Sequence, residues 1–88
     1  MKINRDFTIQ KVGASYVAVA VGETSKKFHG MIRLNETGAF LWNQMTERDC
    51  TEEELVEALL AEYDIDRETA TTDVKRMLDG LKGYPVFA

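Results

Sequence analysis

The chain has 88 residues and a mass of 10.0 kDa, which predicts one small domain over residues 1–88. The net charge of −4 argues against a general nucleic-acid binder, and the longest stretch without charge, Val12 to Gly22, is too short to cross a membrane. A single cysteine excludes an internal disulfide framework, and no basic, apolar leader opens the chain, so we expect a cytoplasmic protein that binds neither nucleic acid nor membrane.

The residue types also limit catalysis. One histidine, His29, and one cysteine, Cys50, are too few for a conventional zinc site unless many carboxylates contribute. The sequence has no glycine-rich phosphate loop, no Ser-His-Asp set and no evident pair of nucleophile and base. We therefore expect a binding protein that is not an enzyme and carries no cofactor.

The first third of the chain predicts three β-strands. Residues Phe7–Val12 alternate between apolar and polar side chains, and Tyr16–Val21 is rich in β-branched residues with valines on one face. A polar loop over Gly22–Lys27 leads to a third strand, Phe28–Leu34, which Gly30 interrupts. The simplest assembly of these strands is an antiparallel meander.

The rest of the chain predicts three helices, each with an N-cap residue. The caps are Asn35, Thr51 in a capping box with Glu54, and Asp66. The predicted helices run from Glu36 to Met45, from Thr51 to Tyr63, and from Asp66 to a stop at Gly83. The third helix carries one apolar stripe, made of Ala70, Val74, Met77, Leu78 and Leu81.

Strands followed by helices define an α+β domain of the order βββααα, with the helices packed on one face of the sheet. The outer edge of the third strand then has no neighbour, so its backbone groups are free to pair with another chain. We expect a monomer or a weak homodimer. The first 34 residues hold six basic and two acidic residues, whereas residues 51–64 hold six acidic residues and no basic one.

The segment Phe28 to Trp42 resembles the strand–helix junction of the PqqD-like family, the small proteins typified by the peptide chaperone of pyrroloquinoline quinone biosynthesis. The resemblance extends in order and spacing over about residues 5–83. The matching residues are Leu34-Asn35-Glu36-Thr37, Thr51 with Glu54-Leu55, Leu59-Leu60, Tyr63-Asp64-Ile65-Asp66, and Asp73-Val74 with Leu78 and Leu81.

The resemblance implies a winged-helix-like domain that binds the leader of a ribosomally made precursor peptide and presents it to a modifying enzyme, often a radical S-adenosylmethionine enzyme. In that family the leader adds as a strand along the third strand, in a groove beside the third helix, and pyrroloquinoline quinone is not bound as a cofactor. Carried over to this chain, it predicts these peptide-binding residues: Phe28, His29, Met31, Ile32, Arg33, Leu34, Ala70, Val74, Lys75 and Leu78.

Within that groove we expect Val74 and Leu78 to form an apolar floor, with Met31 or Leu34 opposite. Arg33 and Lys75 would favour a leader with acidic residues. Which residues of the stripe belong to the core and which line the groove stays open at this point.

Two further questions stay open from the sequence. The same fold serves DNA-binding regulators, although residues 66–83 balance four bases against four acids, which is unlike a DNA-reading helix. The tail from Lys82 to Ala88 is shorter and more aromatic than the usual family ending, and it can be placed across the groove or at the edge of the sheet.

Overall fold

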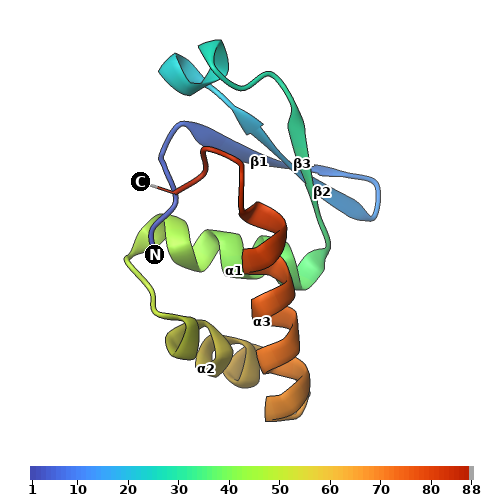
Figure 1. Ribbon diagram of the computed structural model, residues 1–88. Helices are drawn as coiled ribbons and strands as arrows, with labels where there is room; N and C mark the ends of the chain where they lie inside the picture. Colours follow the sequence, from blue (N-terminus) through green and yellow to red (C-terminus); the bar gives the residue numbers. More distant parts are fainter. Residues whose placement is uncertain (88) are drawn as a thin grey trace.

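The protein is described by a computed structural model over residues 1–87, and Ala88, the last residue of the predicted tail, lies outside the described residues. The order βββααα is confirmed, with a short 3₁₀ helix added before the third strand (Figure 1). The elements are β1 (Phe7–Val12), β2 (Ser15–Ala20), η1 (Gly22–Lys26), β3 (Met31–Leu34), α1 (Glu36–Glu47), α2 (Glu52–Glu62) and α3 (Arg67–Leu81).

The sheet is an antiparallel meander in the order β1-β2-β3, as predicted. Its register aligns Ile9 with Ala18 and Ala18 with Ile32, so these three side chains share the face that meets the helices. Ala18 and Ile32 are buried, whereas Val17 and Val19 lie half-buried on the opposite face. Small alanines on the inner face allow the helices to approach the sheet closely.

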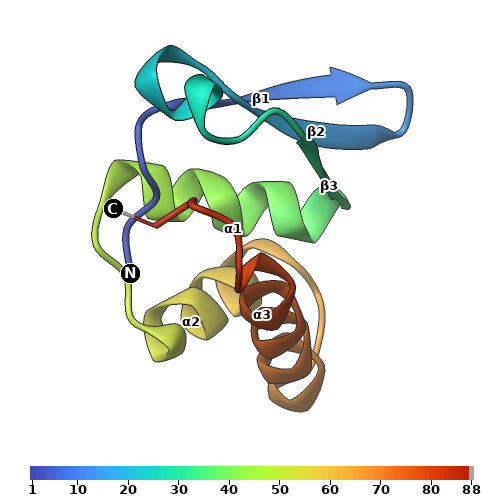
Figure 2. The same ribbon diagram turned by 45° about the horizontal axis from the view of Figure 1, so that its top comes forward.

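Helix α1 forms the layer between the sheet and the other two helices (Figure 2). Its Trp42 is 1% exposed and meets the Phe7 ring of β1 edge-to-face, with ring centroids 5.6 Å apart. Buried Leu41 and Met45 lie on the same helix, and Leu59 of α2 is also fully buried. Trp42 therefore belongs to the core, as expected of the largest apolar side chain on the first predicted helix.

The third strand is shorter than predicted, because residues 28–30 do not pair with β2. The backbone N–H of Phe28 donates to the carbonyl of Thr24 at 2.9 Å, which continues the turn that ends η1. The Phe28 ring then folds back over Gly30, where a Cβ would lie 3.1 Å from the ring. The prediction of Phe28 and His29 as strand residues is therefore wrong, and so is the prediction of a plain loop over Gly22–Lys27.

All three predicted N-caps are present. Asp66 accepts from the backbone N–H of Thr69 at 2.7 Å, and Thr51 and Glu54 form the reciprocal capping box. The hydrogen bond from the Thr51 backbone N–H lowers the pKa of the Glu54 carboxyl, and that from Thr69 lowers the pKa of Asp66. Both carboxylates thus cap their helices in the ionised form, where the helix dipole also favours them.

The tail after α3 occupies neither of the two predicted places. Gly83, at φ +90°, follows the end of the helix, and the chain then returns to the N-terminal segment, where the backbone N–H of Asn4 donates to the carbonyl of Val86 at 2.7 Å. The Val86 side chain is fully buried, and Tyr84 packs edge-to-face on Phe28 at 5.5 Å. The tail therefore completes the core beside the start of β1. Among residues 1–87, no helix is long and apolar enough to span a bilayer.

The junction of β3 and α1 generates a stability prediction. Asn35 Oδ1 accepts from the backbone N–H of Gly38 at 2.8 Å, so Asn35→Ala is expected to lower the free energy of unfolding by about 0.5–2 kcal/mol. A Cβ on Gly38 would lie 2.9 Å from that same oxygen, so Gly38→Ala is expected to disturb the same cap. Urea unfolding of both single variants and the double variant measures the coupling. Fully additive losses would remove Asn35 from the capping role.

Candidate functional site

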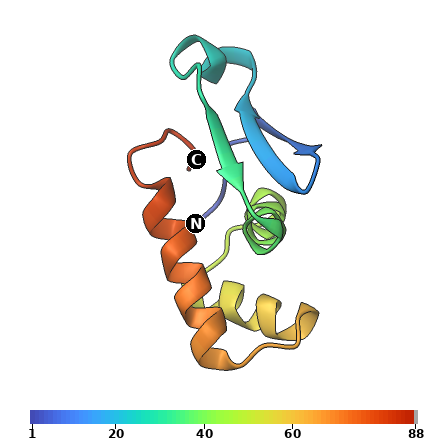
Figure 3. The same cartoon turned by 90° about the vertical axis from the view of Figure 1, so that its right-hand side faces the viewer.

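A groove lies between β3 and α3, with the beginning of α1 as its base. In Figure 3 α1 is seen nearly end-on, with β3 and α3 on different sides of it. The groove has a volume of about 440 Å³. It is lined by Ser15 of β2, Ile32, Arg33 and Leu34 of β3, Asn35, Thr37, Gly38 and Leu41 at the start of α1, and Asp73, Arg76, Met77, Gly80 and Leu81 of α3.

The strand wall of the groove follows from the alternation of side chains along β3. Ile32 and Leu34 are 6% and 8% exposed and face the helices, whereas Met31 is 69% exposed and shares the outer face with Arg33. Within residues 1–87, β3 is an edge strand that pairs with β2 alone. Because alternate backbone N–H and C=O groups of an edge strand point outward, this wall offers unused main-chain hydrogen-bonding groups.

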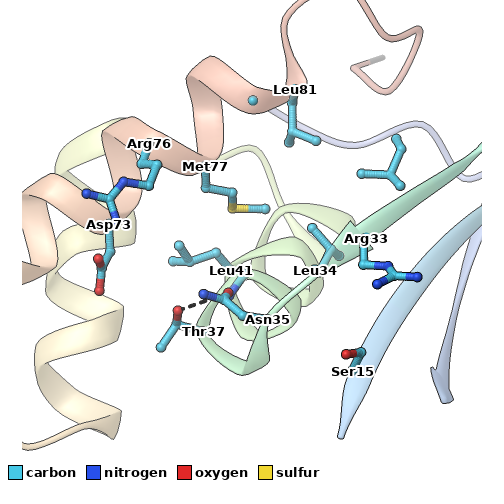
Figure 4. Close-up of a pocket in the computed structure, with 13 residues that line it drawn as sticks. Ser15, Arg33, Leu34, Asn35, Thr37, Leu41, Asp73, Arg76, Met77 and Leu81 are labelled. Carbon is cyan, nitrogen blue, oxygen red and sulfur yellow. Dashed lines mark hydrogen bonds between the residues drawn. The ribbon is translucent and has the colours of Figure 1, made fainter. Parts of the chain in front are cut away.

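The helix wall follows from the periodicity of α3. Asp73, Met77 and Gly80 are spaced by four and three residues, so they share one face, and Arg76 lies beside them. In Figure 4 the Met77 side chain lies between α3 and the Leu34 and Leu41 side chains, with Asp73 and Arg76 further along the helix. The floor is therefore apolar, and the charged groups stand at the rim.

The rim carries charges that the fold itself does not use. The ion pairs formed within residues 1–87 include Arg67 with Glu57 and Lys82 with Asp79, but none includes Arg33, Asp73 or Arg76. Arg33 and Arg76 are both exposed. Arg76, which stands at the rim on α3 without an ionic partner, makes the groove suitable for a ligand that carries a carboxylate, whereas the Arg33 side chain lies on the outer face of β3.

The structure brings together only part of the predicted site. The side chains of Ile32 and Leu34 line the groove, whereas Arg33 borders it from the outer face of β3, where Met31 also lies. Half-buried Phe28 packs between Phe7 and Tyr84, and exposed His29 precedes the strand.

The predicted residues of α3 lie elsewhere on the helix. Ala70 and Val74 are fully buried in the core, so neither lines the groove. Lys75 and Leu78 border a different hollow, shared with Met1, Glu52, Asp79, Lys82 and Phe87. The expectation of a floor made by Val74 and Leu78 is therefore wrong, because one residue along a helix turns the side chain by about 100°.

Four of the groove residues that sequence reasoning missed form its apolar floor and its charged rim on α3 and α1. Arg76 and Met77 replace Lys75 and Leu78, and Gly80 and Leu41 complete the apolar surface. The spacing of Asp73, Met77 and Gly80 is the one sequence signal that these residues share a face of the helix. It is weak by itself, because the sequence alone does not say which flank of the apolar stripe faces β3.

Neither a metal site nor a catalytic set stands out in this groove. Among residues 1–87, no group of three or more His, Cys, Asp or Glu side chains is placed to hold a metal ion. Cys50 is buried at the start of α2, away from the groove-lining residues, where its thiol contacts the carbonyls of Gln44 and Arg48. What the groove offers is a strand edge, an apolar floor and charged side chains at its rim, which are features of a binding surface.

A winged-helix-like α+β domain with a groove between its edge strand and its last helix is thus the class that the structure defines. The family model for PqqD, described as coenzyme PQQ synthesis protein D, matches residues 16–84. The chain belongs to the PqqD family, which confirms the resemblance seen in the sequence. No curated protein matches the chain significantly in sequence.

Two solved structures have a similar fold. One is TbiB1 in complex with the TbiA(beta) leader peptide, at 27% identity and a TM-score of 0.65, covering 96% of this chain and 98% of that chain. The other is the lasso peptide synthetase B1 complexed with the leader peptide, at 16% identity and a TM-score of 0.66, covering 97% and 93%. The second likeness supports the fold alone.

The groove's anatomy predicts which substitutions the fold tolerates. Arg76→Gln is expected to change the free energy of unfolding by less than about 0.5 kcal/mol, because Arg76 is exposed and unpaired. Leu41→Ala removes a side chain that is 1% exposed and is expected to cost about 2–5 kcal/mol. Chemical denaturation measures both. A large loss in Arg76→Gln would mean that this arginine serves the fold rather than a ligand.

Proposed function

We propose that this protein binds an extended leader segment of a precursor peptide along β3 and presents it to a modifying enzyme, without itself catalysing a reaction. The observation that carries the proposal is the unpaired edge of β3 at the wall of an apolar groove. The edge satisfies the backbone of an added strand, and the groove accepts its side chains.

The similarity to TbiB1 supports the same proposal. That protein is 27% identical to this chain, matches it over nearly the full length of both, and was solved with a leader peptide. The sheet also has a second edge, at β1, but no residue of β1 lines the groove beside α3. An added strand at β3 can therefore use a helix as a second wall, whereas one at β1 lacks this groove.

In this geometry the backbone and the side chains of the peptide are recognised in different ways. Main-chain hydrogen bonds to β3 give an affinity that tolerates many sequences. Successive side chains of an added strand point in opposite directions, so every second one enters the apolar floor at Leu34, Leu41 and Met77. Acidic residues of the peptide would pair with Arg76 on the helix, which makes the site selective.

A peptide explains this surface better than DNA does. The basic residues of α3 and its C-cap do not form one patch, because Arg67 pairs with Glu57 and the C-cap residue Lys82 pairs with Asp79. Lys75 and Arg76 border different hollows of the surface. Helix α2 begins with three glutamates and would repel phosphates.

The identity of the modifying enzyme is a separate matter. The sequence resemblance predicts a radical S-adenosylmethionine enzyme, and this stays a prediction. The family description names coenzyme PQQ synthesis, whereas one structural neighbour is a lasso peptide synthetase, so similar folds occur with different products.

The proposal predicts a specific pattern of affinities. We would select binders from a displayed library of random peptides of about a dozen residues, synthesise a selected peptide, and titrate it calorimetrically. We expect peptides that combine apolar residues with Asp or Glu, and we expect Arg76→Glu to weaken binding about tenfold. The matched control Lys75→Glu makes the same charge change on the other flank of α3 and is expected to alter affinity less than about twofold.

Higher salt is expected to lower the affinity of the wild-type protein for the peptide, because salt screens surface ion pairs. The affinity of the Arg76→Glu variant is expected to fall less. Selection that yields no binding peptide would contradict the proposed function. Equal losses in Arg76→Glu and Lys75→Glu would place the peptide outside the groove.

A further inference from the structure

Gly80 is the one glycine of this chain for which the fold supplies no reason. The chain has six glycines, and each of the other five has a backbone or packing requirement. Gly13, Gly22 and Gly83 have positive φ angles, where other residues are strained. A Cβ on Gly30 would crowd the Phe28 ring at 3.1 Å, and one on Gly38 would lie 2.9 Å from Asn35 Oδ1.

At Gly80 neither requirement exists. The residue lies inside α3, its φ is not positive, and a Cβ built on it would have no heavy atom within 4 Å. Glycine in a helix is less stable than alanine, because the unfolded chain loses more backbone freedom on folding. Alanine would therefore fit the folded domain and stabilise it.

The position of Gly80 shows where the missing side chain would point. Gly80 follows Met77 by three residues, Arg76 by four and Asp73 by seven, so it lies on the groove face of α3. It lines the groove together with Leu81 and Ile32. A methyl group or a larger side chain on Gly80 would occupy space inside the groove.

We propose that Gly80 sets the size of the side chain that the groove accepts, and that the bound peptide places a large apolar residue, aromatic or long aliphatic, against the bare α3 backbone at Gly80. This inference rests on the proposed function. The neighbouring wall suits such an anchor, since Met77 is half-buried, flexible and able to pack against aromatic rings through its sulfur. Ile32 and Leu81 line the same groove and supply further apolar surface.

The test separates the stability of the fold from its affinity for a peptide. Gly80→Ala is expected to raise the melting temperature by about 2–8 °C and to weaken binding of the peptide selected on the wild-type protein several-fold. Gly80→Leu is expected to weaken the same peptide by about tenfold or more, because added groups in a filled site overpack it. Thr72→Leu places a leucine at an exposed position of α3 outside the groove, and its affinity is expected to match the wild type.

A second selection from the same library on the Gly80→Leu protein completes the test. The winning peptides are expected to carry a smaller residue where those from the wild type carry a large apolar one. Unchanged affinity in both Gly80 variants, or the same winning peptides on Gly80→Leu, would overturn the role of Gly80 and leave the proposed function intact. Failure of the wild-type protein to select any peptide would instead overturn the proposed function.

If Gly80→Leu does not fold, as judged by its melting curve, Gly80→Ala decides the matter alone. A variant that is more stable than the wild type and binds less tightly cannot owe its lost affinity to unfolding. A variant that is more stable and binds equally well would show that the glycine has no part in recognition.

Discussion

The edge-to-face contact between Phe7 of β1 and Trp42 of α1 joins the sheet to the helical part of the domain. Helix α1 is the only layer between the sheet and the other two helices in the described chain, so its packing on the alanines of β2 decides how far β3 stands from α3 (Figure 2). In a domain of 88 residues the core is thin, so each buried contact between sheet and helices matters. The groove is a consequence of that arrangement.

A three-stranded meander leaves one strand edge beside the helices, and an exposed edge carries a risk of aggregation. Here β3 is only four residues long, and exposed Arg33 follows exposed Met31 on its outer face. A short edge with a charged residue discourages pairing with a second copy of itself, and in the proposed function the groove favours a peptide whose side chains fit it. The open edge of β3, which carries a risk of aggregation, is thus useful if a peptide is the partner that covers it.

Local signals predicted the elements well. The caps at Asn35, Thr51 and Asp66 depend on residues three positions apart, and each one is present. Phe28 was misplaced because its side chain prefers a distant partner, Phe7, and its backbone completes the turn of η1 instead of the strand. This contact with a residue far away in the sequence outweighs the local β propensity of the segment. The residue types near position 28 do not reveal such a contact.

The groove-facing residues of α3 were predicted less well, for a geometric reason. The stripe that includes Ala70 and Val74 marks the buried side of the helix. Such a stripe is bordered by two flanks, and either of them could face β3. Lys75 and Leu78 lie on one flank, and Arg76 and Gly80 lie on the other. Only the three-dimensional path of the chain decides which flank meets β3. The tail was unpredictable for a similar reason, since Val86 is buried through pairing with the N-terminal segment.

The central claim is that a peptide adds as a strand to β3, and hydrogen–deuterium exchange measured by mass spectrometry tests it most directly. With a peptide bound, the account predicts slower exchange in residues 31–34, while β1, the other edge of the same sheet, exchanges as before. Protection of β1, or of the α2–α3 surface around Lys75, with no change in β3, would contradict it.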